Sequence, residues 1–85
     1  MDKKRIIELR GKAQALKPTV HVGKEGATDE VVAEIGNQLK KNKLVKAKLL
    51  PSVEEDRKAV GQELAEKTGS VLIEVRGRTV VLAKD

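Results

Sequence analysis

The chain has 85 residues, enough for one domain with a single modest core, and we expect residues 1–85 to form it. Hydrophobic residues make up 39% and charged residues 36%, without any Phe, Tyr or Trp. The core must therefore be aliphatic, and binding of single strands by stacking bases on aromatic side chains is excluded. The absence of cysteine excludes disulfides and thiolate metal sites. The charged N-terminal stretch resembles neither a signal peptide nor a membrane span, so we expect a cytoplasmic protein. We also expect it to be a monomer.

In the first half of the chain, the pattern predicts a helix, a short strand and a second helix. The first helix is predicted over residues 2–16, and Pro18 stops it because the residue before a proline avoids helical backbone. Its apolar stripe consists of Ile6, Leu9, Ala13 and Leu16. Residues 19–22 alternate like a strand. Thr28 is suited to cap a helix that runs to about Lys41, with Asn42 as its left-handed C-terminal residue.

In the second half of the chain, the pattern predicts a strand, a helix and a hairpin. Residues 44–50 alternate between apolar and basic side chains, and Ser52 is a plausible cap for a third helix that ends at Gly69. Residues 70–75 and 79–84 are predicted as two strands joined by a tight turn at residues 76–78. The fold class expected from this α-β-α-β-α-β-β order is α/β (α+β). We expect a two-layer sandwich with a four-stranded mixed sheet and right-handed crossovers.

Basic residues are concentrated in two segments of the chain. Residues 1–18 contain six basic and two acidic residues, and residues 37–51 contain five lysines and no acidic residue. Residues 19–36 and 54–69 are instead acidic in balance. The net charge is +5 and the pI is about 9.6, which favours a polyanionic partner. Segregation of the charge is what a polyanion-binding face requires.

Catalytic and metal-binding patterns are missing. The one histidine, His21, lies in a predicted strand, and the two serines lie at the starts of predicted elements. No second imidazole, thiol or pair of carboxylates stands out as its partner. The segment Gly23-Lys24-Glu25-Gly26 lacks the spacing and the Lys-Ser/Thr ending of a P-loop. We therefore expect no enzyme activity, no cofactor and no metal.

The two glycines of that segment, Gly23 and Gly26, bracket a loop between the first strand and the second helix. Glycines let a phosphate backbone come close, and the amides around Thr28 at the helix start can donate to it. The KH domain clamps nucleic acid with a GxxG loop of this kind. Lys24 would add a charged contact, whereas Glu25 would point away or contact sugar hydroxyls. The alternative is an ordinary turn between a strand and a helix.

Basic side chains outside the loop form the second candidate set. Lys46 and Lys48 share one face of their predicted strand, and Arg76 and Arg78 could lie near that face. These lysines could instead protect an exposed sheet from edge-to-edge pairing. Lysines at the end of the second helix could simply interact with the helix C-terminus. The full set that we expect to orient a phosphate backbone is Lys12, Lys17, Lys40, Lys46, Lys48, Arg76 and Arg78.

The whole pattern resembles the CRM domain (chloroplast RNA splicing and ribosome maturation), in particular its stand-alone YhbY-like members. The likeness extends over "LRGKAQALKP", "VHVGKEGAT", "EIGNQLKKNKLVKAKL", "KTGS" and "IEVRGRTVVLAK". It implies RNA binding without catalysis and a fold similar to the C-terminal domain of translation initiation factor 3. It also implies that Gly23, Lys24, Glu25 and Gly26 form the RNA-contacting loop, flanked by basic residues. Family members act in ribosome assembly on large-subunit precursors, or in plant organelles as parts of splicing factors.

We therefore predict an RNA-binding protein that docks on the phosphate backbone of structured RNA through the GxxG loop and the basic patch. The resemblance implies ribosomal precursor RNA, and pre-ribosomal particles, as partners. The alternative is a protein-interaction module that contacts a ribosomal protein, with the basic charge serving only solubility. DNA binding is a third, weaker alternative.

Overall fold

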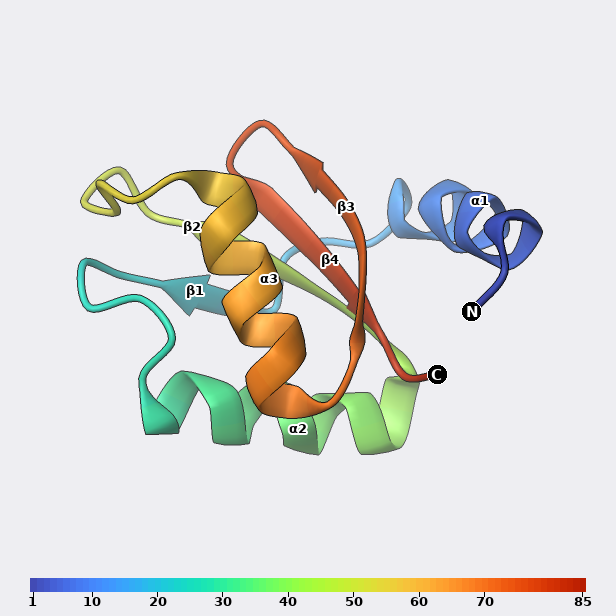
Figure 1. Cartoon of the computed structure of the whole chain (residues 1–85), viewed down its shortest axis with the longest axis horizontal. Coiled ribbons are helices and arrows are strands. Elements are labelled where there is room, and N and C mark those ends of the chain that lie inside the picture. The colour runs from blue at the N-terminus through green and yellow to red at the C-terminus, as the bar shows by residue number, and fades with distance from the viewer.

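The computed structural model describes residues 1–85 as three helices around a four-stranded mixed sheet (Figure 1). The order and type of the elements match those predicted from the sequence, which confirms the expected fold class. None of the helices combines the length and the apolar character that a membrane-crossing segment needs. In chain order the elements are α1 (Lys3–Ala13), β1 (Val20–Val22), α2 (Asp29–Asn42), β2 (Leu44–Leu49), α3 (Arg57–Thr68), β3 (Val71–Arg76) and β4 (Thr79–Ala83).

The strands lie in the order β1-β2-β4-β3. β1 and β2 are parallel neighbours, and α2 connects them. β4 is antiparallel to both β2 and β3, so β2 and β3 run in the same direction with β4 between them. The connection from β2 to β3 contains α3. Both connections between parallel strands therefore use a helix, as crossovers of this kind usually do.

The main core lies between the sheet and the layer formed by α2 and α3. Its fully buried side chains are aliphatic and come from both helices and from the three strands β1, β2 and β4. α3 approaches the sheet closely at Gly61, where an added Cβ would lie 3.1 Å from Leu72 Cδ1 and 3.3 Å from Val80 Cγ1. Even a Cβ here would require the side chains of Leu72 and Val80 to shift by a few tenths of an ångström. Glycine at this position therefore permits the close approach of α3 to the sheet.

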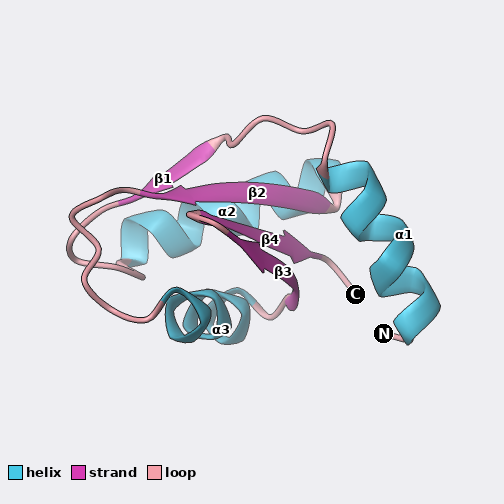
Figure 2. Cartoon of the chain, turned by 90° about the horizontal axis from the view of Figure 1, so that it is seen from above, coloured by secondary structure: helices cyan, strands magenta, loops and turns pink.

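α1 packs on the opposite face of the sheet and covers only one end of it. A smaller cluster holds it there, in which Leu9 and Ala13 are buried against Ile73, Val81 and Ala83. Figure 2 shows α1 at one end of the sheet, well separated from α3. The sandwich thus has one full helical layer, while the other face is partly open.

The helix ends differ from the sequence-based prediction at three places. α1 ends at Ala13 and not Leu16, because the amide of Leu16 turns back to the carbonyl of Ala13 at 3.0 Å in a tighter turn. α3 begins at Arg57, since Asp56 and not Ser52 caps it by accepting from the amide of Ala59. The left-handed residue that ends α2 is Lys43, with φ of 62°, and not Asn42.

Candidate nucleic-acid interface

The loop between β1 and α2 is a tight turn bounded by two glycines. The amide of Gly26 donates to the carbonyl of Gly23 at 2.9 Å, and Gly26 has a φ of +71°. Thr28 caps α2 as predicted, since its hydroxyl oxygen accepts from the amide of Val31 at 3.2 Å. The amide of Thr28 donates to the carbonyl of Gly26 at 2.9 Å and is therefore occupied. Among the loop's amides, those of Gly26 and Thr28 thus hold the turn together.

Other amides of the loop are free to bind a ligand. The backbone N–H groups of Lys24 and Glu25 at the tip, and of Asp29 and Glu30 at the helix start, make no hydrogen bond within the chain. A hollow of about 280 Å³ lies beside them, lined by Gly23–Gly26, Thr28 and Val31. The molecule's own side chains leave this space open, so a phosphate could approach the backbone there.

The charge around the loop works against an anion, however. Lys24 is the only cation of the loop, and the carboxylates of Glu25, Asp29 and Glu30 follow within six residues. A carboxylate oxygen of Glu55 lies 3.7 Å from the position that a Cβ on Gly26 would take. Lys67 of α3 also reaches the loop and donates to the carbonyl of Ala27 at 3.2 Å, but its charge is paired with Glu63 at 3.0 Å. With several carboxylates beside the free amides, this loop alone is a poor phosphate site.

The open part of the sheet carries a row of four polar side chains, one from each strand. In the register of the sheet, His21 lies opposite Lys48, Lys48 lies opposite Thr79, and Thr79 lies opposite Arg76. Their strand neighbours are buried on the α2–α3 face, so the row points to the opposite face, beyond the end that α1 covers. We call these residues the sheet row. Lys48 and Arg76 are exposed and make no ion pair or side-chain hydrogen bond.

Lys46 and Arg78 make hydrogen bonds that stabilise the fold. The Nζ of Lys46 donates to the carbonyls of Ala13 at 3.4 Å and Leu16 at 3.3 Å, at the end of α1. The carbonyl of Ala13 also accepts from the amide of Leu16, so the lysine is a second donor there. Its two hydrogen bonds fasten the end of α1 to β2. The guanidinium of Arg78 donates to the carbonyl of Leu50 at 3.4 Å and ties the β3–β4 turn to the end of β2.

A second and larger hollow lies between α1, β2 and the end of α2. It has a volume of about 550 Å³, and we call it the α1–β2 cleft. Three leucines, Leu9, Leu16 and Leu44, contribute its apolar surface. Five basic residues and no acidic residue line it: Arg5, Lys12, Lys17, Lys43 and Lys46.

Sequence reasoning identified Lys12, Lys17 and Lys46 but missed Arg5 and Lys43. Arg5 and Lys12 are seven residues apart, which is about two helical turns, so they share one face of α1. This spacing could have identified Arg5 from the sequence. Lys43 gave no such signal. Its place in the cleft depends on the left-handed turn between α2 and β2.

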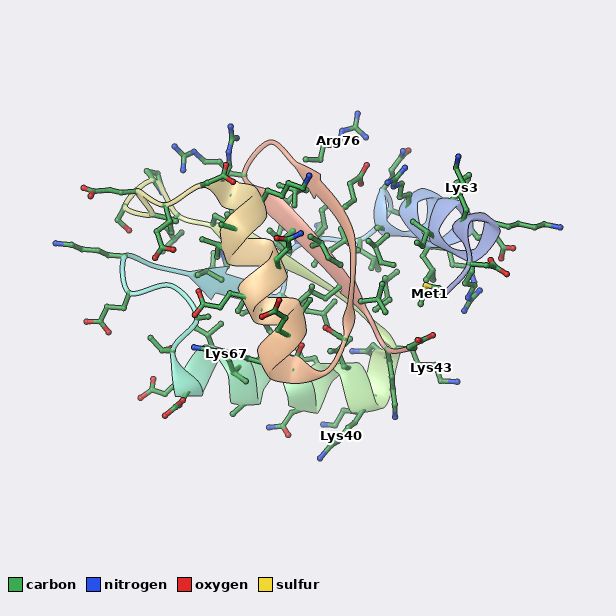
Figure 3. All side chains as sticks on the ribbon, viewed as in Figure 1. Met1, Lys3, Lys40, Lys43, Lys67 and Arg76 are labelled. Atoms are coloured by element: carbon green, nitrogen blue, oxygen red, sulfur yellow. The ribbon has the colours of Figure 1, made fainter.

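Lys40 lies apart from the other predicted basic residues. Figure 3 shows it below α2, on the side of the molecule opposite Arg76. There it lines a small hollow with Thr68, Ser70 and Lys84. Its position near the end of α2 suits the helix dipole. Contact between RNA and Lys40 stays a prediction.

The two loop glycines should respond differently to substitution. Gly26→Ala is expected to lower the free energy of unfolding by about 1–2 kcal/mol, because a φ of +71° strains any residue with a side chain. Gly23→Ala should change it by less than about 0.5 kcal/mol, since its Cβ would meet only Leu50 Cδ1 at 3.9 Å. Urea denaturation followed by circular dichroism measures both. Equal losses in the two variants would contradict the assigned backbone conformation.

Comparison with known proteins identifies relatives along nearly the whole chain. The chain is 36% identical over 77 residues to "Probable RNA-binding protein YqeI" of Bacillus subtilis, covering 91% of this chain and 80% of that protein. It is 36% identical over 76 residues to "Probable RNA-binding protein MJ0652" of Methanocaldococcus jannaschii, covering 87% of this chain and 56% of that protein. A protein of Haemophilus influenzae named "RNA-binding protein" is 31% identical over 74 residues, covering 87% and 75% of the two chains.

A solved structure has the same fold. The solution structure of SAV1595 from Staphylococcus aureus, described as a candidate RNA binding protein, superposes with a TM-score of 0.87. The two chains are 27% identical, and the match covers 100% of this chain and 88% of that one. The model of the CRS1 / YhbY (CRM) domain family matches residues 1–84. The chain therefore belongs to the CRS1 / YhbY (CRM) domain family.

Proposed function

We propose that this protein binds structured RNA through its sugar–phosphate backbone and catalyses no reaction. The observation that carries the proposal is the sheet row, in which Lys48 and Arg76 stand unpaired on the part of the sheet face that α1 leaves uncovered. Relatives named as RNA-binding proteins support RNA as the polyanion. The chain has no aromatic side chain on which bases could stack, and the sheet row offers cations for the backbone instead.

The geometry suggests how the backbone would lie. Lys48 and Arg76 are on strands separated by β4, so their Cα atoms stand about 10 Å apart, or two strand spacings. Two cations at this separation can contact different phosphates of one RNA. β1 leads from His21 in the row to Gly23, so the GxxG loop lies at the edge of the same surface. The free amides of Lys24 and Glu25 would then contact the RNA beyond the row.

We propose further that the RNA is ribosomal precursor RNA bound during assembly of the large subunit. The resemblance to CRM domains supports this step, because members of that family act on such precursors. Assembly of this kind would place the protein in the cytoplasm, with pre-ribosomal particles as its wider partners.

Removing the two unpaired cations of the sheet row tests the proposed function. The double variant Lys48→Gln/Arg76→Gln should bind a structured RNA roughly tenfold more weakly, because two charge-assisted contacts to phosphate are lost. The slope of log affinity against log salt should fall by about two. Lys3→Gln/Lys58→Gln removes the same charge from exposed helix positions and is the matched control. If both double variants bind alike, net charge alone explains the affinity and the sheet row is not the interface.

Two substitutions in the GxxG loop should change RNA affinity in opposite directions. Lys24 and Glu25 are adjacent and exposed at the loop tip, and neither side chain makes an ion pair. Lys24→Gln should weaken RNA binding roughly fivefold, and Glu25→Gln should strengthen it by a similar factor, about 1 kcal/mol each. Filter binding at two salt concentrations measures both changes. Weaker binding by Glu25→Gln would mean that its carboxylate accepts hydrogen bonds from sugar hydroxyls.

The identity of the RNA can be tested in cells. Ultraviolet crosslinking of the protein, followed by sequencing of the attached RNA, should enrich precursor sequences of large-subunit ribosomal RNA over total RNA. The Lys48→Gln/Arg76→Gln variant serves as the control for unspecific attachment. Recovery of no RNA above this control, together with a protein complex that resists high salt, would favour the protein-interaction module instead.

A further inference from the structure

The α1–β2 cleft differs in chemistry from the rest of the proposed interface. We propose that it binds one unpaired nucleotide of the RNA, with the phosphate among its cations and the base or ribose against its leucines. This inference rests on the proposed function, because it takes RNA as the ligand. It adds a pocket for a single nucleotide to a surface that otherwise contacts only the backbone.

The first support is the charge of the cleft. Lys12, Lys17 and Lys43 are exposed and make no ion pair or side-chain hydrogen bond within the chain. Arg5 is the exception among the exposed cations, since its guanidinium lies 3.4 Å from the carboxylate of Glu8. Like charges held together repel one another until an anion neutralises them. The cleft is therefore a stronger phosphate site than the GxxG loop, where one lysine faces several carboxylates.

The second support is the apolar surface inside the ring of cations. Leu16 is 39% exposed, and Leu44 is half-buried at the start of β2. Together with Leu9 they give a base or ribose an aliphatic contact in a chain that lacks aromatic residues. The side-chain amide of Asn42, which also lines the cleft, makes no hydrogen bond within the chain and can pair with a base edge.

The shape of the cleft selects an unpaired nucleotide over a base-paired one. Its volume of about 550 Å³ lies within the range of pockets that enclose small ligands. A nucleotide in a duplex keeps its base stacked inside the helix, so only its phosphate could touch the rim. An unpaired nucleotide can turn its base into the hollow and contact the leucines. An acidic peptide would satisfy the cations but would leave the apolar surface without a partner.

The cleft is also connected to the sheet row. Lys46 on its wall and Lys48 in the row are two residues apart on the same face of β2. An RNA strand that leaves the cleft along β2 therefore reaches the sheet row directly. The GxxG loop lies at the other end of the 14-residue helix α2, about 21 Å away along the helix axis. The row lies between the two hollows, so one RNA can contact all three.

The test compares two RNAs that share one stem, a blunt hairpin and the same hairpin with a single-stranded tail. Lys12→Gln/Lys17→Gln should bind the tailed hairpin about tenfold more weakly than the parent does and leave the blunt hairpin within twofold. Lys48→Gln/Arg76→Gln should weaken both RNAs, and Lys3→Gln/Lys58→Gln should weaken neither. Lys46 is left intact because it fastens α1, and thermal melts confirm that each variant folds.

The outcomes separate the two proposals. If the cleft variant binds both RNAs like the parent while the sheet-row variant weakens both, the cleft inference is wrong and the proposed function stands. If the cleft variant weakens both RNAs equally, the cleft binds backbone without an unpaired nucleotide, and the inference is again overturned. If the sheet-row variant weakens neither RNA, the proposed function is wrong.

A second measurement tests the cleft without a large RNA. Titration of the labelled protein with adenosine monophosphate, followed by nuclear magnetic resonance, should shift the amide signals of Lys12, Lys17 and Lys43 in a saturable way. Inorganic phosphate should shift them less, because it makes no contact with the leucines. Equal shifts with phosphate or with a short polyglutamate peptide, or no shift with the nucleotide, would overturn the inference.

Discussion

The packing of α1 against one end of the sheet determines which surfaces a ligand can reach. Leu9 and Ala13 anchor the helix in the smaller core cluster, and Lys46 fastens its C-terminal end to β2. An 11-residue helix is only about 16 Å long, so it cannot cover a sheet face of four strands. The sheet row therefore remains in solvent. The same contact also forms the wall of the α1–β2 cleft, so one packing event creates both parts of the proposed interface.

The two ends of α2 differ in charge, as the helix dipole favours. Asp29 and Glu30 in its first turn, and Lys40 and Lys41 in its last turn, all stabilise the helix. Consequently the free amides of the GxxG loop lie beside carboxylates, whereas the C-terminal end of α2 is capped by Lys43, which lines the cleft. The acidic residues that stabilise the start of α2 therefore oppose anion binding at the loop. At the other end, a basic residue favours both the helix and a bound anion. This contrast supports the cleft and the sheet row, more than the loop, as the proposed phosphate contacts.

The aliphatic composition limits both the core and the interface. The chain builds its core from Val, Leu, Ile and Ala, and it brings α3 close to the sheet through Gly61. Dense packing of small residues compensates for the missing aromatic side chains. At the surface the same composition removes base stacking and leaves amides, cations and leucines as the available contacts. The structural match to SAV1595 and the family membership show that this fold is shared, and the relatives named as RNA-binding proteins agree with such an interface.

Local patterns in the sequence were sufficient to predict the order of the elements, the cap at Thr28, the shared face of Lys46 and Lys48, and the family. These features depend on residues close together in the chain, where helical or strand spacing acts directly. The start of α3 was misplaced because Val53 packs into the core, which holds the residues after β2 in a loop until Asp56. Only the tertiary structure decided which face of the sheet α1 occupies. That choice depends on contacts between residues more than sixty positions apart, and it brought Arg5 and Lys43 into one cleft.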